Sequence, residues 1–307
     1  MQFNNSKIWF IYNPNSARVL KKGSLLKKYY RRFNAQLHSL EKFSDVQIVV
    51  SKALENKVSY VCIEGGDGTT HGVITAFLKQ STNSNLPFFI LIPGGNTNQI
   101  SKNIGIKSAS IKALKKSFKV NKVINTPILS ITDNNKNSYF GFLFSSGALP
   151  QLTDYTKNRF HQRGIGGSFA VVGGMLKGFK KNNKITQPTK IKVDIRTTQN
   201  HKIDDLHFGS IVTTLPSLIL KLDPFWGKQE FPLRVTYASS NHKKLIKNVI
   251  SLWLGNKNKS RKQDGLFSWN ATKIKFHYTG PCMLDGEFLS LSNNFVISST
   301  KPLNFIR

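Results

Sequence analysis

The fold is decided by the stretch Val61-Cys62-Ile63-Glu64-Gly65-Gly66-Asp67-Gly68-Thr69-Thr70, which continues as His71-Gly72-Val73-Ile74-Thr75-Ala76-Phe77-Leu78. An apolar, β-branched run stops at two glycines, and apolar residues then recur at helical spacing. This pattern predicts a strand, a tight turn and an amphipathic helix. Any chemistry that the stretch supports would lie at the turn.

The turn has the residue types of a phosphate site. Glycines at 65, 66 and 68 lack a Cβ, so backbone N–H groups can approach a ligand closely. A helix that begins near Thr69 would direct its unpaired N–H groups and the positive end of its dipole at the same place. The Asp67 carboxylate among these donors indicates a magnesium nucleotide more than a bare phosphate. From this loop alone, glycines that only satisfy a sharp turn are an equal alternative.

Other strand ends have a similar composition. A strand over residues 7–12 runs into Asn13-Pro14-Asn15-Ser16-Ala17, and a strand over 86–93 runs into Gly94-Gly95-Asn96-Thr97-Asn98-Gln99. Between them we predict a basic helix over 24–40 and a buried strand over 46–50 that ends at Ser51. The carboxyl ends of parallel strands meet at one edge of an open sheet, where ligands bind. The polar strand ends therefore predict one shared site.

The second half of the chain has a different texture. After a helix over 108–119, short apolar runs alternate with Asn, Gly and Pro from Val123 to about Phe276, which predicts a mainly antiparallel β domain. We expect a first domain over 1–123, a second over 124–289, and a segment over 290–307 that returns to close the first. An apolar helix with basic ends over 159–181 would be core or a lid that meets lipid chains.

Composition limits the classes of protein. The 307 residues suit two domains, and no run approaches the ~18 apolar residues of a membrane-spanning helix. No signal-peptide core is present near the start, and two cysteines in apolar segments indicate neither a disulfide framework nor a zinc site. Lys and Arg number 45 against 15 Asp and Glu, a net charge of +30. Such an excess predicts an anionic partner: a nucleic acid or an acidic membrane surface, since a polyphosphate substrate alone would not need it.

The glycine turn resembles the GGDGT signature of the diacylglycerol kinase-like family, which includes sphingosine and ceramide kinases and, more distantly, NAD kinases. Three further stretches resemble family motifs in the family's order. Asn13, Pro14 and Ser16 match an NPxSG motif, Pro93, Gly95 and Asn98 match PxGTxN with Asn96 at the threonine position, and Asp285-Gly286-Glu287 match DGE. The resemblance covers nearly the whole chain. It implies an α/β N-terminal domain with an open, mostly parallel sheet, followed by a C-terminal, mainly antiparallel β-sandwich domain.

The resemblance also implies roles for individual residues. ATP and Mg²⁺ are the expected ligands, with Asp67 at the metal. Glu287 would accept the proton of the acceptor hydroxyl, Asp285 would support it, and a cleft between the domains would bring residues 67 and 287 together. The residues expected at the nucleotide are Asn13, Ser16, Ser51, Gly65, Gly66, Asp67, Gly68, Thr69, Gly95, Asn96 and Asn98.

A kinase of this family would transfer the γ-phosphate of ATP to the hydroxyl of a membrane lipid, diacylglycerol or a relative. The charge then has a reason, because each basic residue near an anionic leaflet contributes ~1 kcal/mol to membrane binding. We expect a cytoplasmic enzyme at the inner face of the membrane that binds a nucleotide and a lipid acceptor and forms a homodimer. No established nucleic-acid-binding motif is present, so no specific nucleic acid partner is expected.

The sequence departs from the family at Ala17, Asn96 and especially Gly72, where a glutamate is usual. A catalytically degenerate, membrane-associated member is therefore one alternative. A nucleic-acid-binding protein, with Tyr29 and Tyr30 among basic residues, is another. An NAD kinase would carry a second Asn-Glu motif, which we do not find. An acidic cluster for the structural Mg²⁺ site of some bacterial members is also not found.

Overall fold

The computed structural model describes residues 7–81, 86–120, 122–161, 187–218, 222–228, 230–254, 256 and 261–307. The chain forms two compact units, Met1–Thr126 with Pro302–Arg307 and Pro127–Lys301. We call them the first and the second unit and describe each by itself. Of the predicted core or lid helix over 159–181, everything after His161 lies outside the described residues.

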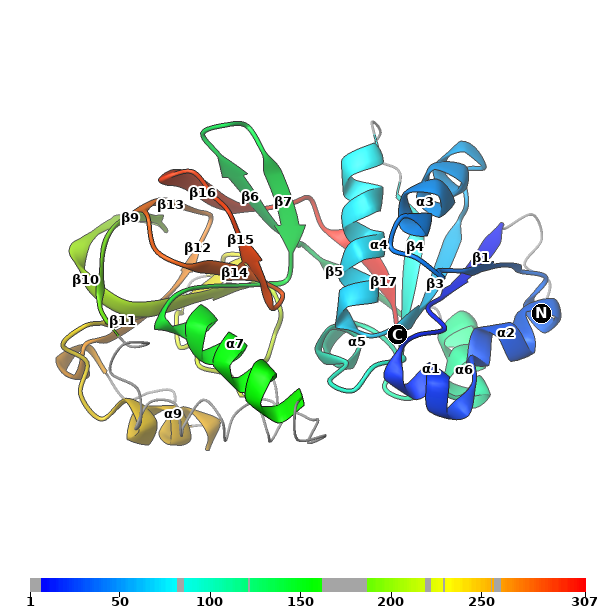
Figure 1. Cartoon of the computed structure of the whole chain (residues 1–307), viewed down its shortest axis with the longest axis horizontal. Helices are drawn as coiled ribbons and strands as arrows, with labels where there is room; N and C mark the ends of the chain where they lie inside the picture. Colours follow the sequence, from blue (N-terminus) through cyan, green and yellow to red (C-terminus); the bar gives the residue numbers. More distant parts are fainter. Residues whose placement is uncertain are drawn as a thin grey trace. The chain divides into compact units, whose positions relative to one another are not determined.

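The first unit contains an open six-stranded sheet with the order β2-β1-β3-β4-β17-β5 (Figure 1). All neighbouring pairs are parallel except β17 with β5. This confirms the predicted α/β unit with a mostly parallel sheet. The strands are β1 (Ile8–Tyr12), β2 (Gln36–Ser39), β3 (Tyr60–Gly65), β4 (Phe88–Pro93), β5 (Val123–Thr126) and β17 (Leu303–Ile306).

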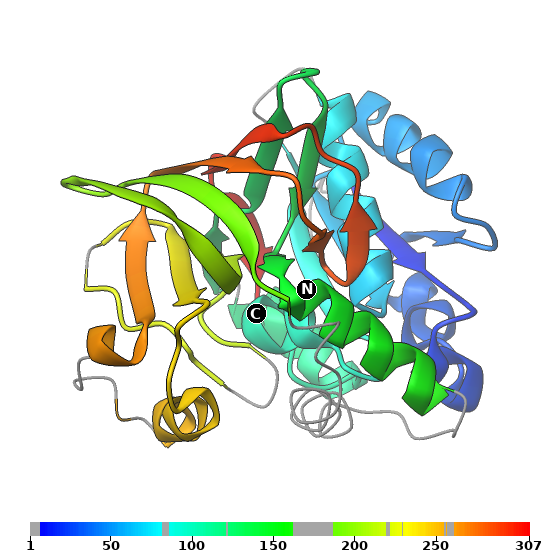
Figure 2. The same ribbon diagram turned by 60° about the vertical axis from the view of Figure 1, so that its left-hand side comes forward.

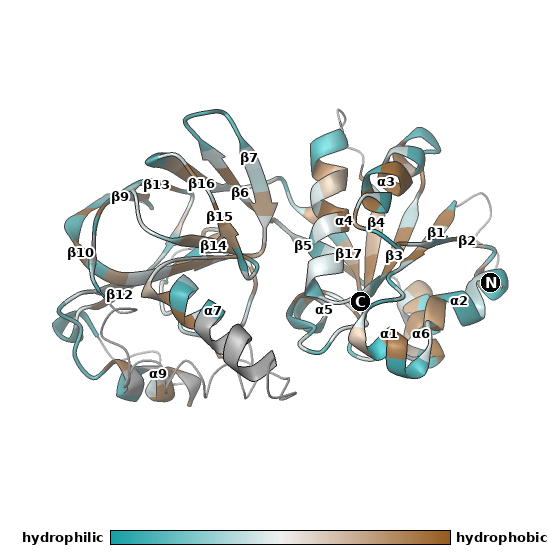
Figure 3. Cartoon of the chain, viewed as in Figure 1, coloured by the Kyte–Doolittle hydropathy of each residue, from teal (hydrophilic) through white to brown (hydrophobic). Residues whose placement is uncertain are grey.

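Helices cover both faces of this sheet, which is why its central strands are apolar along their length (Figure 3). On one face, Leu26 of α2 and Leu114 and Phe118 of α6 share a core cluster with Phe10 and Ile90 of the sheet. Elsewhere α3 and α4 lie side by side (Figure 1). The helices are α1 (Ala17–Lys22), α2 (Leu25–Tyr29), the 3-10 turn η1 (Tyr30–Phe33), α3 (Asp45–Glu55), α4 (Asp67–Gln80), α5 (Gln99–Ile104) and α6 (Ile111–Val120).

Two predictions for residues 24–55 were wrong. The predicted helix over 24–40 contains short helical turns followed by strand β2, and the predicted strand over 46–50 is part of helix α3. The buried residues of α3 are Val46, Val49, Val50 and Ala53, whose spacing of three, one and three marks one helix face. The β-branched residues of this run had suggested a strand. Tertiary packing of that one face overrides their preference.

The second unit contains one antiparallel sheet of eleven strands (Figure 1). This confirms the predicted antiparallel second domain. Strand β10 pairs with β9 along its first part and with β8 and β11 along its second, so it belongs to both halves of a strongly curved sheet (Figure 2). The strands are β6 (Leu129–Asp133), β7 (Ser138–Gly141), β8 (Leu143–Gly147), β9 (Thr189–Arg196), β10 (Asn200–Thr213), β11 (Leu233–Ser239), β12 (Leu266–Ala271), β13 (Lys273–Tyr278), β14 (Cys282–Leu284), β15 (Glu287–Leu289) and β16 (Asn294–Ser299). The helices are α7 (Ala148–His161), α9 (Leu245–Trp253) and the 3-10 turn η3 (Lys262–Asp264).

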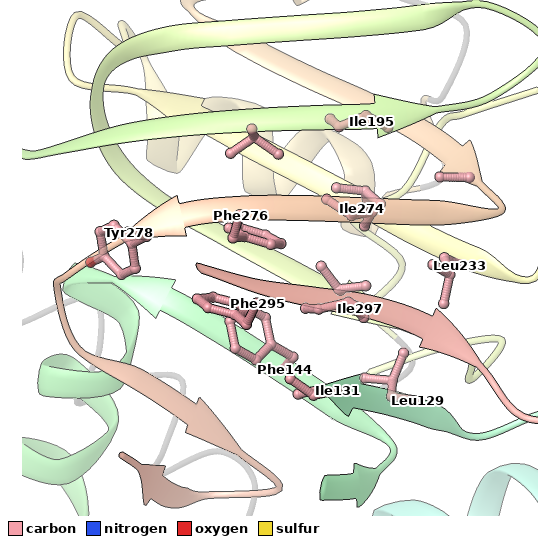
Figure 4. Close-up of a cluster of buried hydrophobic side chains, with 14 of the residues drawn as sticks. Leu129, Ile131, Phe144, Ile195, Leu233, Ile274, Phe276, Tyr278, Phe295 and Ile297 are labelled. Carbon is pink, nitrogen blue, oxygen red and sulfur yellow. The ribbon is translucent and has the colours of Figure 1, made fainter. Parts of the chain in front are cut away.

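The curved sheet encloses its own core (Figure 4). Strand β9 alternates buried and exposed residues along its length, as expected for a sheet with one face on a core. At the centre the Phe276 and Phe295 rings stack with centroids 4.8 Å apart, and Phe144 lies 5.6 and 5.8 Å from them. Both halves of the sheet contribute to this cluster, so they share one hydrophobic core.

The predicted closing segment over 290–307 was only partly right. Strand β17 joins the first sheet beside β4, but β16 pairs with β6 and β13 in the second sheet. The reason is that Phe295 and Ile297 are buried in the core of the second unit. No helix in the described part of the chain is long and apolar enough to cross a membrane.

Candidate functional site

The turn between β3 and α4 presents unpaired backbone donors. Gly66 is the N-cap residue of α4, and the bond from Thr70 N to Gly66 O, 3.0 Å, closes the first turn. Among the described residues, no acceptor is found for the N–H groups of Asp67, Gly68 and Thr69. Apart from its chain neighbours and the backbone of its own helix, no heavy atom lies within 4 Å of the place where a Cβ on Gly68 would stand. Unpaired donors at the start of a helix, beside open space, make a site for an anion.

Two glycine turns pack against each other at this place. Gly94 N donates to Gly65 O at 2.8 Å. A Cβ on Gly95 would lie 2.7 Å from Gly66 Cα, and a Cβ on Gly94 would lie 2.8 Å from Gly65 Cα. Because backbone touches backbone, only glycine fits these positions. The ends of β3 and β4 are therefore held together without side chains between them.

Side chains from other turns complete the arrangement. Asn13 Nδ2 donates to Thr69 Oγ1 at 2.9 Å, and Ser16 Oγ accepts from Gly66 N at 3.3 Å. Asn98, with φ of 51°, uses its amide to bond Gly95 N and Gly95 O at 2.8 and 2.7 Å. The ends of β1, β3 and β4 thus meet, as the sequence predicted.

Not every predicted nucleotide residue joins this group. Asn96 lies exposed in the turn after β4. Ser51 lies on α3, where its Oγ donates to Glu55 Oε1 at 2.8 Å one helical turn away. Ser51 was expected to follow a strand of the same sheet. That strand is part of helix α3, so the strand prediction was wrong, and a role of Ser51 at the nucleotide stays a prediction.

Asp67 has a structural task that the sequence did not reveal. Its Oδ2 accepts from Gln99 N at 2.9 Å and its Oδ1 from Ile100 N at 2.8 Å, so the carboxylate caps helix α5. Burial raises the pKa of Asp67, opposed by the backbone hydrogen bonds from Ile100 and Gln99 and by the charge of Lys102. The carboxylate joins the turn after β3 to the helix after β4.

A magnesium ion would find few ligands at this turn. The described residues contain no group of three or more His, Cys, Asp or Glu side chains that could hold a metal. Asp67 would be a single ligand whose two oxygens already accept backbone hydrogen bonds. Mg²⁺ commonly binds one or two carboxylates together with substrate phosphates and water. The residues present build no metal site of their own, and a role of Asp67 at Mg²⁺ stays a prediction.

Glu64 is a functional neighbour that the sequence reasoning missed. Its side chain is fully buried and accepts from Arg18 Nη1 at 2.8 Å and Ser24 Oγ at 2.6 Å. The N–H groups of Leu25 and Leu26 donate to it at 3.0 Å each, so it caps α2. A glutamate inside an apolar strand, directly before the glycines, was the signal that could have identified it, because a buried charge needs partners.

The second motif forms a two-residue hairpin turn between β14 and β15. Asp285 and Gly286 have φ of 49° and 90°, the left-handed pair that such turns need. The Asp285 carboxylate accepts from Leu143 N at 2.8 Å and from Phe142 N at 3.0 Å. A Cβ on Gly141 would lie 2.8 Å from Asp285 Oδ2. The aspartate therefore ties the hairpin to the start of β8.

Glu287, the first residue of β15, is exposed. Asp67 belongs to the first unit and Glu287 to the second. That the two carboxylates meet across a cleft stays a prediction.

Gly72, which stands where a glutamate is usual in the family, lies against the ring of Phe43. A Cβ on this residue would lie 3.1 Å from Cε2 of Phe43. Phe43 itself is 75% exposed, so its ring covers Gly72 while remaining open to solvent. A glutamate at position 72 would require this ring to move.

The first unit thus combines a mostly parallel sheet with glycine turns at its strand ends, and the second unit is an antiparallel sheet. Residues 7–126 match the family model of the diacylglycerol kinase catalytic domain. This match confirms the resemblance to the diacylglycerol kinase-like family that was seen in the sequence. No curated protein sequence matches the chain.

Solved structures support the fold of the whole chain. A Bacillus anthracis protein provisionally assigned as a diacylglycerol kinase is similar with a TM-score of 0.72 and 16% identity, over 98% of this chain and 96% of that one. A diacylglycerol kinase of the same organism gives 0.64 and 13%, over 98% and 96%. An NAD kinase from Archaeoglobus fulgidus in complex with ATP gives 0.52 and 11%, over 98% and 93%. These likenesses establish the fold.

Proposed function

We propose that the protein is an ATP-dependent lipid kinase that transfers the γ-phosphoryl group to the hydroxyl of a membrane lipid, diacylglycerol or a close relative. The observation that carries the proposal is the set of unpaired N–H groups of Asp67, Gly68 and Thr69 at the start of α4, beside the open space at Gly68. The family match over residues 7–126 supports phosphoryl transfer as the reaction.

The nucleotide phosphates would lie at the start of α4, where the helix dipole and the N–H groups favour negative charge. Asn13, Ser16 and Thr69 add polar side chains from two strand ends. Phosphoryl transfer through a loose transition state mainly requires positioning and neutralisation of charge. We propose that Mg²⁺ arrives bound to ATP as part of the substrate.

In the transfer step the lipid hydroxyl oxygen forms a bond to the γ-phosphorus while the bond from that phosphorus to the bridging oxygen of ADP breaks. We assign Glu287 as the group that accepts the hydroxyl proton. Its exposure at the start of β15 leaves it accessible to a substrate. Asp285 is a positioning residue, since its carboxylate is engaged with the backbone of Phe142 and Leu143.

The net charge of +30 supports action at an anionic membrane surface, because basic residues near such a surface add to binding. We propose a cytoplasmic, peripherally bound enzyme that forms a homodimer.

The test is transfer of labelled γ-phosphate from Mg-ATP to a total lipid extract in anionic vesicles, with NAD offered in a parallel reaction. Wild type should label a lipid, and Glu287→Gln should lower the rate by about 100-fold or more, since general bases contribute ~10² to 10⁴. Asp194→Asn, which removes an exposed carboxylate of β9, is the matched control and should keep the rate. Label in NAD, or equal rates in all three proteins, would contradict the assignment.

A catalytically degenerate, membrane-associated member is the second candidate. The observation that favours it is the Phe43 ring over Gly72, where the family usually has a glutamate. Vesicle binding without ATP binding or lipid labelling would favour this candidate. Vesicle binding with both would exclude it.

A further inference from the structure

The first unit contains a cavity of about 460 Å³ that is lined by four cationic side chains, Lys107, Lys116, Lys122 and Arg307. Ser108, Ser117 and three apolar residues complete the lining. None of these residues belongs to the glycine turns after β3 and β4. The cavity is therefore made of other residues than those of the proposed nucleotide site.

Segments far apart in the sequence build the walls of this cavity. Lys116, Ser117 and Val120 lie on one face of α6 and point to the cavity, whereas Leu114 and Phe118 pack into the sheet core. Arg307 N donates to Lys122 O at 3.1 Å, and Arg307 Nη1 donates to Asn103 O at 3.3 Å. The guanidinium is thus held partly in place by the end of α5.

The ionisable side chains that line the cavity are all cationic. From residue 68 to residue 132 the sequence contains no Asp or Glu. The ion pairs found among the described residues are Arg18–Glu64, Lys192–Asp204 and Arg234–Asp223, so the cavity cations have none there. Like charges that share a concave surface repel each other and raise the local concentration of anions. An anion bound in the cavity would remove this repulsion.

We propose that the cavity is a second ligand site, which binds a phosphorylated molecule with at least two negative charges and a small apolar part. Its volume lies within the range of ~300 to 1,000 Å³ that is typical of small-molecule sites. Arginine and lysine together suit phosphate, since the guanidinium offers a planar pair of donors and the ammonium a compact charge. A soluble phosphate ester and an anionic lipid headgroup share this chemistry. The proposal does not depend on the kinase activity.

The test measures lysine acetylation residue by residue with mass spectrometry, because the nucleotide site could also bind a polyphosphate. Three probes are compared: tripolyphosphate, vesicles of phosphatidylglycerol with phosphatidylcholine, and vesicles of phosphatidylcholine alone. Lys112 and Lys119 of α6 are not part of the cavity lining and serve as internal controls on the same helix. We expect acetylation of Lys107, Lys116 and Lys122 to slow at least fivefold with an anionic probe, and that of the two controls to change less than twofold.

A matched pair of variants tests the same point by binding. The double variant Lys116→Gln, Lys122→Gln should need at least a tenfold higher probe concentration for half-maximal protection of Lys107 from acetylation. The control double variant Lys112→Gln, Lys119→Gln also removes two positive charges, both from α6. It should change that probe concentration less than twofold.

Each outcome decides the proposal. Protection by tripolyphosphate alone supports a soluble ligand, protection by anionic vesicles alone supports a lipid headgroup, and protection by both supports the phosphate group as the determinant. Equal protection of Lys112 and Lys119 would show general attraction of anions to a basic surface and would overturn the proposal. Absence of protection with every probe would overturn it as well.

Discussion

The two aspartate-glycine turns of this molecule use their carboxylates in the same way. Asp67 accepts from the N–H groups of Gln99 and Ile100, and Asp285 accepts from those of Phe142 and Leu143. Each aspartate ties its turn to the start of another element of its own unit. A motif read as catalytic thus has, in both units, an evident structural task.

The glutamates of the two turns differ. Glu64 precedes the first turn and is fully buried under four donors, whereas Glu287 follows the second turn and is exposed. A carboxylate surrounded by donors is committed to the fold, while an exposed one remains open to a substrate. The comparison shows that one turn places its glutamate inside the fold and the other places its glutamate at the surface, where a substrate can reach it.

The largest effect should follow from Glu64→Ala. Its removal leaves Arg18 and the first N–H groups of α2 without their acceptor, and breaking a buried ion pair costs about 3 to 5 kcal/mol of unfolding free energy. Urea denaturation followed by tryptophan fluorescence measures it. Glu287→Ala is the paired control and should change the value by less than about 0.5 kcal/mol. Similar values for both variants would break the comparison.

Asp67→Ala and Asp285→Ala should come next. Each leaves two backbone N–H groups without a partner, which costs about 1 to 3 kcal/mol. Hydrogen exchange can localise the effect: we expect faster exchange at Gln99 and Ile100 in the first variant, and at Phe142 and Leu143 in the second. Unchanged exchange at these amides would show that the aspartates do not hold the turns.

The pH dependence of the unfolding free energy should differ between the two units, and this effect should be smaller than those of the substitutions above. Burial raises the pKa of Asp67 above its ordinary 3.8, so the stability that this group contributes is present below pH 3.8 and is lost as pH rises through its pKa in the folded protein. Burial lowers the pKa of His207 below its ordinary 6.5, despite a hydrogen bond to Thr189 and the charge of Asp205. Its contribution is therefore present above pH 6.5 and is lost as pH falls through the folded pKa.

The measurement is the difference in unfolding free energy between wild type and each variant across pH. For Asp67→Asn the difference, wild type minus variant, should fall as pH rises, and for His207→Gln it should rise with pH. Slopes of the same sign would contradict the assigned pKa directions.

Much of this arrangement could be predicted from the sequence because it depends on local rules. Glycines after an apolar run mark a turn, and at Gly65 an added Cβ would lie 2.5 Å from Thr69 Cβ. The order of the motifs indicated the sheet edge where the turns meet. The run at Val46 to Val50 was harder, since β-branched residues suit a strand and the helix depends on packing against α4. The secondary-structure preferences of residues 46–50 do not reveal the contact between α3 and α4.

Contacts between distant segments account for what the sequence did not reveal. The cap that Asp67 provides to α5 spans the turns after β3 and β4, and Glu64 reaches α2 across a large separation in sequence. The ring of Phe43 over Gly72 is of the same kind. A residue's type shows that it needs partners, but the folded chain decides which partners it finds.

The smallest change in stability should come from Gly68→Ala, which is also the sharpest test of the first turn. The added methyl group meets no atom within 4 Å, and alanine is favoured over glycine in a helix by about 0.8 to 1 kcal/mol, so the variant should be slightly more stable. The same methyl group enters the open space where we place the nucleotide phosphates. We therefore expect ATP binding, measured by calorimetry, to weaken at least tenfold in a protein that has gained stability. Gly95→Ala provides the contrast, because its methyl group would meet Gly66 Cα at 2.7 Å and overpacking of this kind costs about 1 to 3 kcal/mol. If Gly68→Ala binds ATP as wild type does, the N–H donors at the start of α4 have no part in nucleotide binding, and the site proposed at the first turn is wrong.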